Sequence, residues 1–344
     1  MVCEGAVMQG MGERAYMYAK ACGIIGKSFV GKGMARLTPV TRLSELDRLV
    51  FPHDPRELPE RELLKDLESR LESRAAGRIV SVLNSFSKPP DFLIRLLRAY
   101  EYADVKNCLA AIVAGESGGP AHTDLGQFGV VNFAAYPDLR GMFRSSEFSW
   151  ICGETLSEST VERILSGLDQ RYYRGLWDAM GKLVKKDRTA IEGILREEIS
   201  LQNAAWALRL RTYYRMDADS IRKRLISIEA PDAGPSVEAL ALSSLSLALD
   251  SREDWQKWKA AGMLNPELPG MPWKADPRYF QNAAAVHLYR MCRHALRRRP
   301  FSMDTAACFI KLMFFEEDYL TSVAEGLSLG LAVPDVFAIL EAQP

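Results

Sequence analysis

The sequence lacks a long hydrophobic run, a net charge and a paired cysteine motif, and each absence excludes a class of protein. No stretch reaches the roughly 20 apolar residues that cross a bilayer, so we expect no direct membrane insertion. Lysine plus arginine and aspartate plus glutamate number 44 each, so no chain-wide field attracts nucleic acid. The six cysteines contain no CxxC pair, which indicates reduced thiols and a cytoplasmic protein.

Runs of alternating β-branched residues are almost absent as well, and helical periodicity takes their place. Within residues 58–86, leucines recur at three- and four-residue steps with charged residues on the opposite face. This spacing predicts one long amphipathic helix that begins near Pro59 and is interrupted near Gly77. The same periodicity covers residues 91–114, 157–214 and 280–340, and only residues 128–133 resemble a strand. The predicted fold class is all-α.

Two Gly/Pro-rich loops, at residues 115–120 and 230–236, divide the chain into three segments that resemble one another. Each segment carries an apolar helix, then a polar joint, then a second helix. Asn203 lies 16 residues before Asp219, and Tyr319 lies 16 residues before Asp335, so two acids recur where a first helical turn favours them. We therefore predict three related domains, 1–117, 118–228 and 229–344, in a pseudo-threefold arrangement. The positions that mark the repeat are Asn107, Asn203, Asp318, Asp219 and Asp335.

Two motifs suggest an enzyme, but their surroundings do not support that interpretation. Residues 21–28 (ACGIIGKS) differ from a phosphate-binding P-loop at the first glycine, and they follow a helical rather than a strand-like segment. Residues 115–119 (GESGG) match the GxSxG pattern, but they also follow a helix instead of a strand. On one helix, His287, Cys292 and His294 have no shared face except for His287 with His294, and no acidic ligand joins them, so we expect no metal site. We expect no catalytic and no cofactor-binding residues.

The densest basic cluster has two interpretations that the residues leave open. It is either the solvated end of a helix, where cations suit the helix dipole, or a contact for an acidic partner surface. Its members are Arg290, Arg293, Arg297, Arg298 and Arg299. Two tyrosine pairs, at residues 172–173 and 213–214, are predicted to pack in the core or between helices.

Four segments together resemble a known family, and the likeness extends over nearly the whole chain. They are AYMYAKACGIIGKSF (15–29), LLRAYEYADVKNCLAAIVAG (96–115), LDQRYYRGL (168–176) followed by LREEISLQNAAWALRLRTYYRMDADSIRKRLI (195–226), and VAEGLSLGLAVPDVFAIL (323–340). In order and spacing they are similar to the C-type subunit of archaeal and bacterial V-type (A-type) ATPases, the homologue of the d-type subunit of eukaryotic V-ATPases. The family tends to have a charged Lys-Glu-x-Glu run where this chain has residues 313–316 (MFFE), and Phe314 or Phe315 is expected to pack there instead.

The resemblance implies three helical domains in a funnel and a non-catalytic role in the central stalk. It implies one copy per complex, peripheral to the membrane, that couples the rotor shaft (D- and F-type subunits) to the proteolipid ring. The coupled process would be ATP-driven ion transport or ATP synthesis. The alternative from the repeats alone is an unrelated α-helical repeat scaffold for protein–protein interaction.

Overall fold

The computed structural model describes residues 2–228 and 236–340, with side chains described from residue 11 onward. Every regular element in these ranges is a helix, and none is a strand, so the all-α prediction is confirmed. The described residues fall into two compact units. Unit 1 holds residues 2–168 and 295–337, and unit 2 holds residues 169–228, 236–294 and 338–340.

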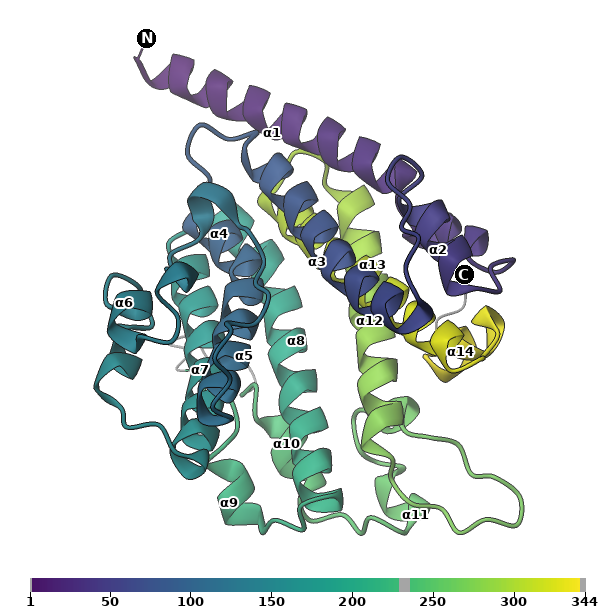
Figure 1. Cartoon of the computed structure of the whole chain (residues 1–344). Coiled ribbons are helices and arrows are strands. Elements are labelled where there is room, and N and C mark those ends of the chain that lie inside the picture. Colours follow the sequence, from purple (N-terminus) through teal and green to yellow (C-terminus); the bar gives the residue numbers. More distant parts are fainter. Residues whose placement is uncertain (1, 229–235, 341–344) are drawn as a thin grey trace. The chain divides into compact units, whose positions relative to one another are not determined.

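Unit 1 is built around two long helices, α3 (Glu60–Leu83) and α13 (Met303–Ser328), which pack side by side. The helices α1 (Val2–Lys27), α2 (Leu43–Val50) and α4 (Asp91–Leu97) pack against this pair (Figure 1). Leu63, Leu67 and Leu71 are buried along one face of α3, as the leucine spacing predicts. Its amphipathic pattern therefore has its cause in this packing, because most helical stability comes from burial of an apolar face.

The helix α3 begins directly after Pro59, as predicted, but the predicted interruption near Gly77 is wrong. A glycine inside a helix costs only about 1 kcal/mol relative to alanine. Ala76 and Ile79 beside it are fully buried, and their packing outweighs that cost. A Cβ placed on Gly77 would meet nothing within 4 Å, so the position is open to solvent rather than bent.

The rest of unit 1 consists of α5 (Ala99–Val113), the short α6 (Leu139–Phe143) and irregular chain between them. The strand-like interpretation of residues 128–133 is wrong: this stretch connects two 3-10 turns, Gly126–Phe128 and Phe133–Ala135. The N–H groups of Val130 and Val131 donate to the side chain of Glu101. The stretch is therefore held by a helix side chain and not by a neighbouring strand.

In unit 2, α8 (Lys185–Thr212) packs against α10 (Ala239–Ser244). The short helices α9 (Ala218–Arg222) and α11 (Arg252–Trp255) lie toward the end of α8 (Figure 1). A core rich in tryptophan contains Trp255, Trp258 and Trp273 together with Phe280. Three described helices, α7 (Glu158–Gly181), α12 (Pro277–Arg298) and α14 (Val333–Ile339), have residues in both units.

The division into three domains and the funnel stay predictions. The predicted boundary between 228 and 229 lies at the edge of the described residues, and the loop at 230–236 lies outside them except for Ser236. The last helix, α14 (Val333–Ile339), follows a turn at Gly330 with φ +78°. In the described residues, no helix combines the length and the apolar character that a membrane crossing requires.

Candidate functional site

The predicted basic cluster lies at the end of α12 and in the turn that follows it. Arg290 and the run 297–299 are exposed. The guanidinium of Arg293 lies 5.4 Å from the ring centroid of Tyr289, a cation–π contact. Arg297 and Arg298 occupy the last turn of the helix, where positive charge suits the helix dipole. The cluster is therefore accessible, and its role as a partner contact stays a prediction.

The predicted polar joints do not interrupt the helices in which they lie. Asn107 lies inside α5, Asn203 inside α8 and Asp318 inside α13, and each helix is continuous through that position. Asp219 and Asp335 lie in the first turns of α9 and α14. Polar residues inside a helix resemble a joint in the sequence, but a polar side chain with a tertiary partner does not interrupt the helix. The equivalence of these positions between repeats stays a prediction.

Asn203 shows what such a partner is. Its side chain is fully buried in unit 2, where Nδ2 donates to the carbonyls of Ile226 (2.9 Å) and Val237 (3.2 Å). Its Oδ1 accepts the N–H of Ile226 at 2.8 Å. One side chain thereby satisfies backbone groups on both sides of residues 229–235, which buried backbone requires. Asn203 fastens the entry to and the exit from that stretch onto α8.

A buried charged site in unit 1 is centred on Glu316 of α13, whose side chain is 2% exposed. Its Oε1 accepts from the backbone N–H of Phe29 (2.9 Å) and from Arg74 (3.1 Å). Its Oε2 accepts from Arg78 at 2.7 Å. Arg74 and Arg78 are four residues apart on α3 and therefore share a face. This Glu316 clamp joins α13, α3 and the chain directly after α1.

The Glu316 clamp is a buried charged group with its partners supplied. Burial lowers the pKa of Arg74, and Glu316 opposes that effect. The guanidinium of Arg36 lies 4.3 Å from the ring centroid of Phe29 and donates to the Ser28 carbonyl at 2.8 Å. The clamp was not predicted from the sequence. Its only sequence signals are two arginines one helical turn apart and a glutamate that follows an apolar run.

A group of acids lies between α3, α5 and α13 in the same unit. The Tyr100 hydroxyl donates to Glu317 Oε2 at 2.5 Å, and its ring meets Phe314 edge-on at 5.2 Å between centroids. Phe314 therefore packs against Tyr100, which agrees with the expectation that Phe314 or Phe315 packs here. Burial raises the pKa of Glu317 to about 8 against the lowering effect of the Tyr100 hydrogen bond. This carboxyl is thus held close to its neutral form.

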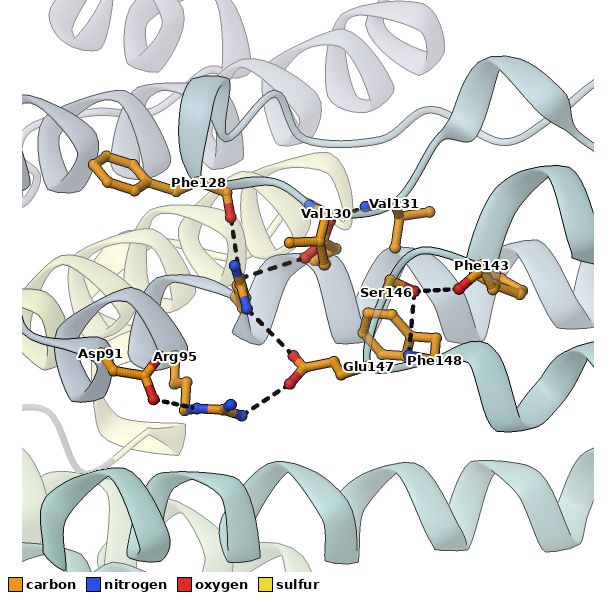
Figure 2. Close-up of polar contacts among 11 residues, drawn as sticks. Asp91, Arg95, Phe128, Val130, Val131, Phe143, Ser146, Glu147 and Phe148 are labelled. Atoms are coloured by element: carbon orange, nitrogen blue, oxygen red, sulfur yellow. Dashed lines mark hydrogen bonds and ion pairs between the residues drawn. The ribbon is translucent and has the colours of Figure 1, made fainter. Parts of the chain in front are cut away.

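Figure 2 shows how the irregular chain of unit 1 is fastened to α4 and α5. Arg95 donates to Asp91 at 3.0 Å and to Glu147 at 2.8 Å. Arg98 donates to the Phe128 carbonyl at 3.0 Å. The guanidinium of Arg98 also lies 3.8 Å from Glu147. The two arginines therefore hold the chain at 128 and at 147 on one side of the α4–α5 pair.

Glu101 completes this network from the next turn of α5. Its Oε1 accepts the consecutive N–H groups of Val130 and Val131, both at 2.6 Å. Burial raises the pKa of Glu101, and the two backbone donors oppose that rise. Arg98 lies 3.9 Å from its other oxygen. The network is structural, because Arg95, Arg98 and Glu101 all bond to the irregular chain that follows α5.

Unit 2 exposes an apolar turn in the loop before α12. The N–H of Met271 donates to the Leu268 carbonyl at 3.1 Å, and Gly270 has φ +78°, which fits a type II turn. Asn265 donates to and accepts from the backbone of 274–276, so the base of the loop is closed. Leu268 is 58% exposed and Met271 is 65% exposed. The loop is thus ordered by its own bonds and presents two apolar side chains to solvent.

The comparison with protein families gives a match over most of the chain. The model described as "ATP synthase (C/AC39) subunit" matches residues 56–335. The chain belongs to this family. A protein of Treponema pallidum (strain Nichols), described as uncharacterized, is 26% identical over 325 residues, which cover 92% of this chain and 93% of that protein. The resemblance to the C-type subunit of V-type ATPases is confirmed at the level of the family.

The clusters described above lie almost wholly within the part of the chain that matches the C/AC39 family. Glu316, Arg74, Arg78 and Asn203 all fall between 56 and 335. The exceptions are Phe29, whose N–H completes the Glu316 clamp from outside the matched region, and the neighbouring Ser28 and Arg36. In this C/AC39 family member the clamp therefore fastens the N-terminal region to the family core.

The two enzyme-like motifs of this family member lie in settings that do not suit catalysis. Residues 21–27 of the P-loop-like motif are part of α1, so their backbone N–H groups cannot converge on a phosphate. Ser117 follows the end of α5 rather than a strand. Among the described side chains, no group of three or more His, Cys, Asp or Glu is arranged to hold a metal ion.

The two tyrosine pairs differ from each other. Tyr172 and Tyr173 lie 5.1 Å apart edge-on, and the Tyr173 hydroxyl donates to Glu198 at 3.4 Å, which agrees with packing between helices. The prediction that Tyr213 and Tyr214 are buried is wrong, because both are exposed. The helix α8 ends at Thr212, so these two side chains lie beyond the packed face.

Proposed function

We propose that this chain is a non-catalytic rotor subunit in the central stalk of a V-type or A-type rotary ATPase. It would join the rotor shaft, made of D- and F-type subunits, to the membrane proteolipid ring, with one copy per complex at the membrane periphery. The observation that carries this proposal is the match to the ATP synthase (C/AC39) subunit family over residues 56–335. Because the family match covers most of the chain, we no longer favour the alternative that the chain is an unrelated α-helical repeat scaffold.

The packing of unit 1 suits a part that transmits torque. A rotor adaptor makes and breaks no bonds, so its physical task is to resist deformation under load. Interiors packed to crystal density have low compressibility and transmit strain. The central helix α13 is buried along most of its length, and Glu316 fixes it to α3 through two arginines. Such a charge pair sets the rotation and the register of one helix against the other.

Two exposed surfaces are the contacts that we propose for partners. The basic cluster at the end of α12 would meet an acidic surface, and the apolar turn at 268–271 would meet the shaft. Centres of protein interfaces are depleted in charge, whereas their rims are polar. Because the turn is ordered before binding, contact with it costs little conformational entropy.

The first test is affinity capture of the tagged chain from native membranes solubilised in mild detergent. The proposal expects shaft and proteolipid subunits in near-stoichiometric amounts. An untagged strain is the control for non-specific recovery. Recovery of neither partner, from a preparation whose ATPase is demonstrably intact, would refute the rotor role.

Two variants then test the proposed surfaces. Charge reversal of Arg297, Arg298 and Arg299 to Glu is compared with reversal of the exposed Lys185 and Lys186. Leu268→Ser with Met271→Ser is compared with Val184→Ser, which is also exposed at 65%. We expect each test variant, and neither control, to lower partner recovery at least fivefold. Equal recovery from test and control variants would remove that surface from the proposal.

A further inference from the structure

Two carboxylates from different helices meet at a single residue of unit 1, Thr123. Its N–H donates to Asp104 Oδ2 of α5 at 2.9 Å, and its hydroxyl donates to Glu72 of α3. Thr123 is 5% exposed and Asp104 is 3% exposed. The chain that follows α5 is therefore fastened to two helices through two acids and one threonine.

The charged groups that act on Asp104 are acids. Burial, together with the charges of Glu72 and Glu101, raises the pKa of Asp104 to about 7, against the lowering effect of the Thr123 N–H. Burial raises the pKa of the Cys108 thiol, and the charge of Asp104 adds to that rise. On the side of α13, Glu317 adds a carboxyl that interacts with Glu72. Asp318, next to it, also acts on Glu317.

The arginine beside Glu101 is already engaged. Arg98 donates to the Phe128 carbonyl and lies 3.9 Å from Glu101. Removal of water from a carboxylate is costly unless a partner charge or a proton neutralises it. Asp104 and Glu72 therefore cannot both be negatively charged beside Thr123 at low cost. Either one of the two carboxyls binds a proton, or the chain at Thr123 moves away.

We infer that Thr123, Asp104 and Glu72 form a proton-controlled latch, which fastens residues 121–131 when the carboxyl pair holds a proton and weakens when the proton leaves. The far end of the segment stays attached, because Glu101 holds Val130 and Val131. Gly126 lies between the two attachments with φ +57°, a conformation that glycine adopts readily. The segment is thus fastened at Val130 and Val131, can change its backbone conformation at Gly126, and can be released at Thr123. This inference does not depend on the rotor role.

The direction of the pH effect follows from proton linkage. Asp104 has an ordinary pKa of 3.8, to which it returns when the segment opens, and a pKa of about 7 when the segment is closed. The closed state binds more protons between these two values. The extra stability that the proton gives the closed state is complete below the lower pKa. Between the two pKa values the ratio of closed to open segment falls about tenfold per pH unit, and above the higher pKa the extra stability is lost.

The test is hydrogen exchange of the full chain between pH 5 and 8.5, followed on peptides that cover 121–125 and corrected for the intrinsic exchange rate. We expect protection at Thr123 to fall about fiftyfold from pH 5 to pH 7 and then to level off toward pH 8. In Asp104→Asn, which keeps an acceptor for the Thr123 N–H, this fall should be absent. The matched control Asp124→Asn removes an exposed acid of the same segment and should keep the wild-type profile.

Three results would overturn the latch. The first is wild-type protection that does not change between pH 5 and 7. The second is an Asp104→Asn profile with the wild-type slope. The third is an equal fall in peptides of α8, which would mean global unfolding instead of local opening. If Asp104→Asn does not fold, Glu72→Gln replaces it: the levelling point should move to lower pH, and an unmoved point contradicts the latch.

Discussion

Replacement of Asn203 by alanine tests whether a polar residue inside a helix can hold a domain together. The variant removes three hydrogen bonds and leaves three buried backbone groups without their partner: the N–H and carbonyl of Ile226 and the carbonyl of Val237. A buried polar group left unpaired costs about 1–3 kcal/mol. Because penalties within one hydrogen-bond network are not additive, we expect a total loss of about 3–5 kcal/mol rather than the full sum.

The assay is native-state hydrogen exchange at Ile226, supported by urea unfolding. A loss of about 3–5 kcal/mol corresponds to a fall of roughly two to three and a half orders of magnitude in protection. Asn107→Ala, at an exposed position of α5, is the matched control and should change stability by less than about 0.5 kcal/mol. Asn203→Asp keeps the acceptor for the Ile226 N–H, but it places a negative charge against the carbonyls of Ile226 and Val237. We therefore expect it to be no more stable than Asn203→Ala. A loss below about 1 kcal/mol for Asn203→Ala would show that the reasoning is wrong.

Three further predictions concern unit 1. A Cβ on Gly326 would overlap the side chain of Val336, so Gly326→Ala should destabilise by about 1–3 kcal/mol in urea unfolding, whereas Gly77→Ala should stabilise by about 0.5–1 kcal/mol. Glu316→Gln leaves two largely buried arginines without a counter-charge and should cost about 3 kcal/mol in the same assay; a loss under about 1 kcal/mol would contradict the Glu316 clamp. Because the pKa of Glu317 is raised from 4.5 to about 8, its burial weakens the fold progressively as pH rises between these two values. Glu317→Gln should therefore gain in melting temperature relative to wild type as pH rises from 5 to 8, and a constant difference would refute this.

Local pattern sufficed for some elements and not for others. The leucine spacing of 58–86 predicts α3 because one buried face repeats with the helical period. The polar positions Asn107, Asn203 and Asp318 resemble joints because sequence shows polarity but not partners. The partners of Asn203 lie 23 and 34 residues away, and nothing local identifies them. The family resemblance identified the family of the chain, but it named none of these partners.

The same limit applies more strongly to the Glu316 clamp. Glu316 lies 238 residues from Arg78 and 287 from Phe29. A buried charge network of this kind often adds less stability than apolar side chains of the same volume would add. Its effect is on specificity, because Glu316 can satisfy both of its oxygens only when α3, α13 and the chain after α1 meet in one register. A helix pair held by leucines alone could slide or rotate at small cost, whereas here any slip would leave a charge buried without its partner. For a part proposed to carry torque, resistance to slip between α3 and α13 matters more than added stability, and that is the property the Glu316 clamp supplies.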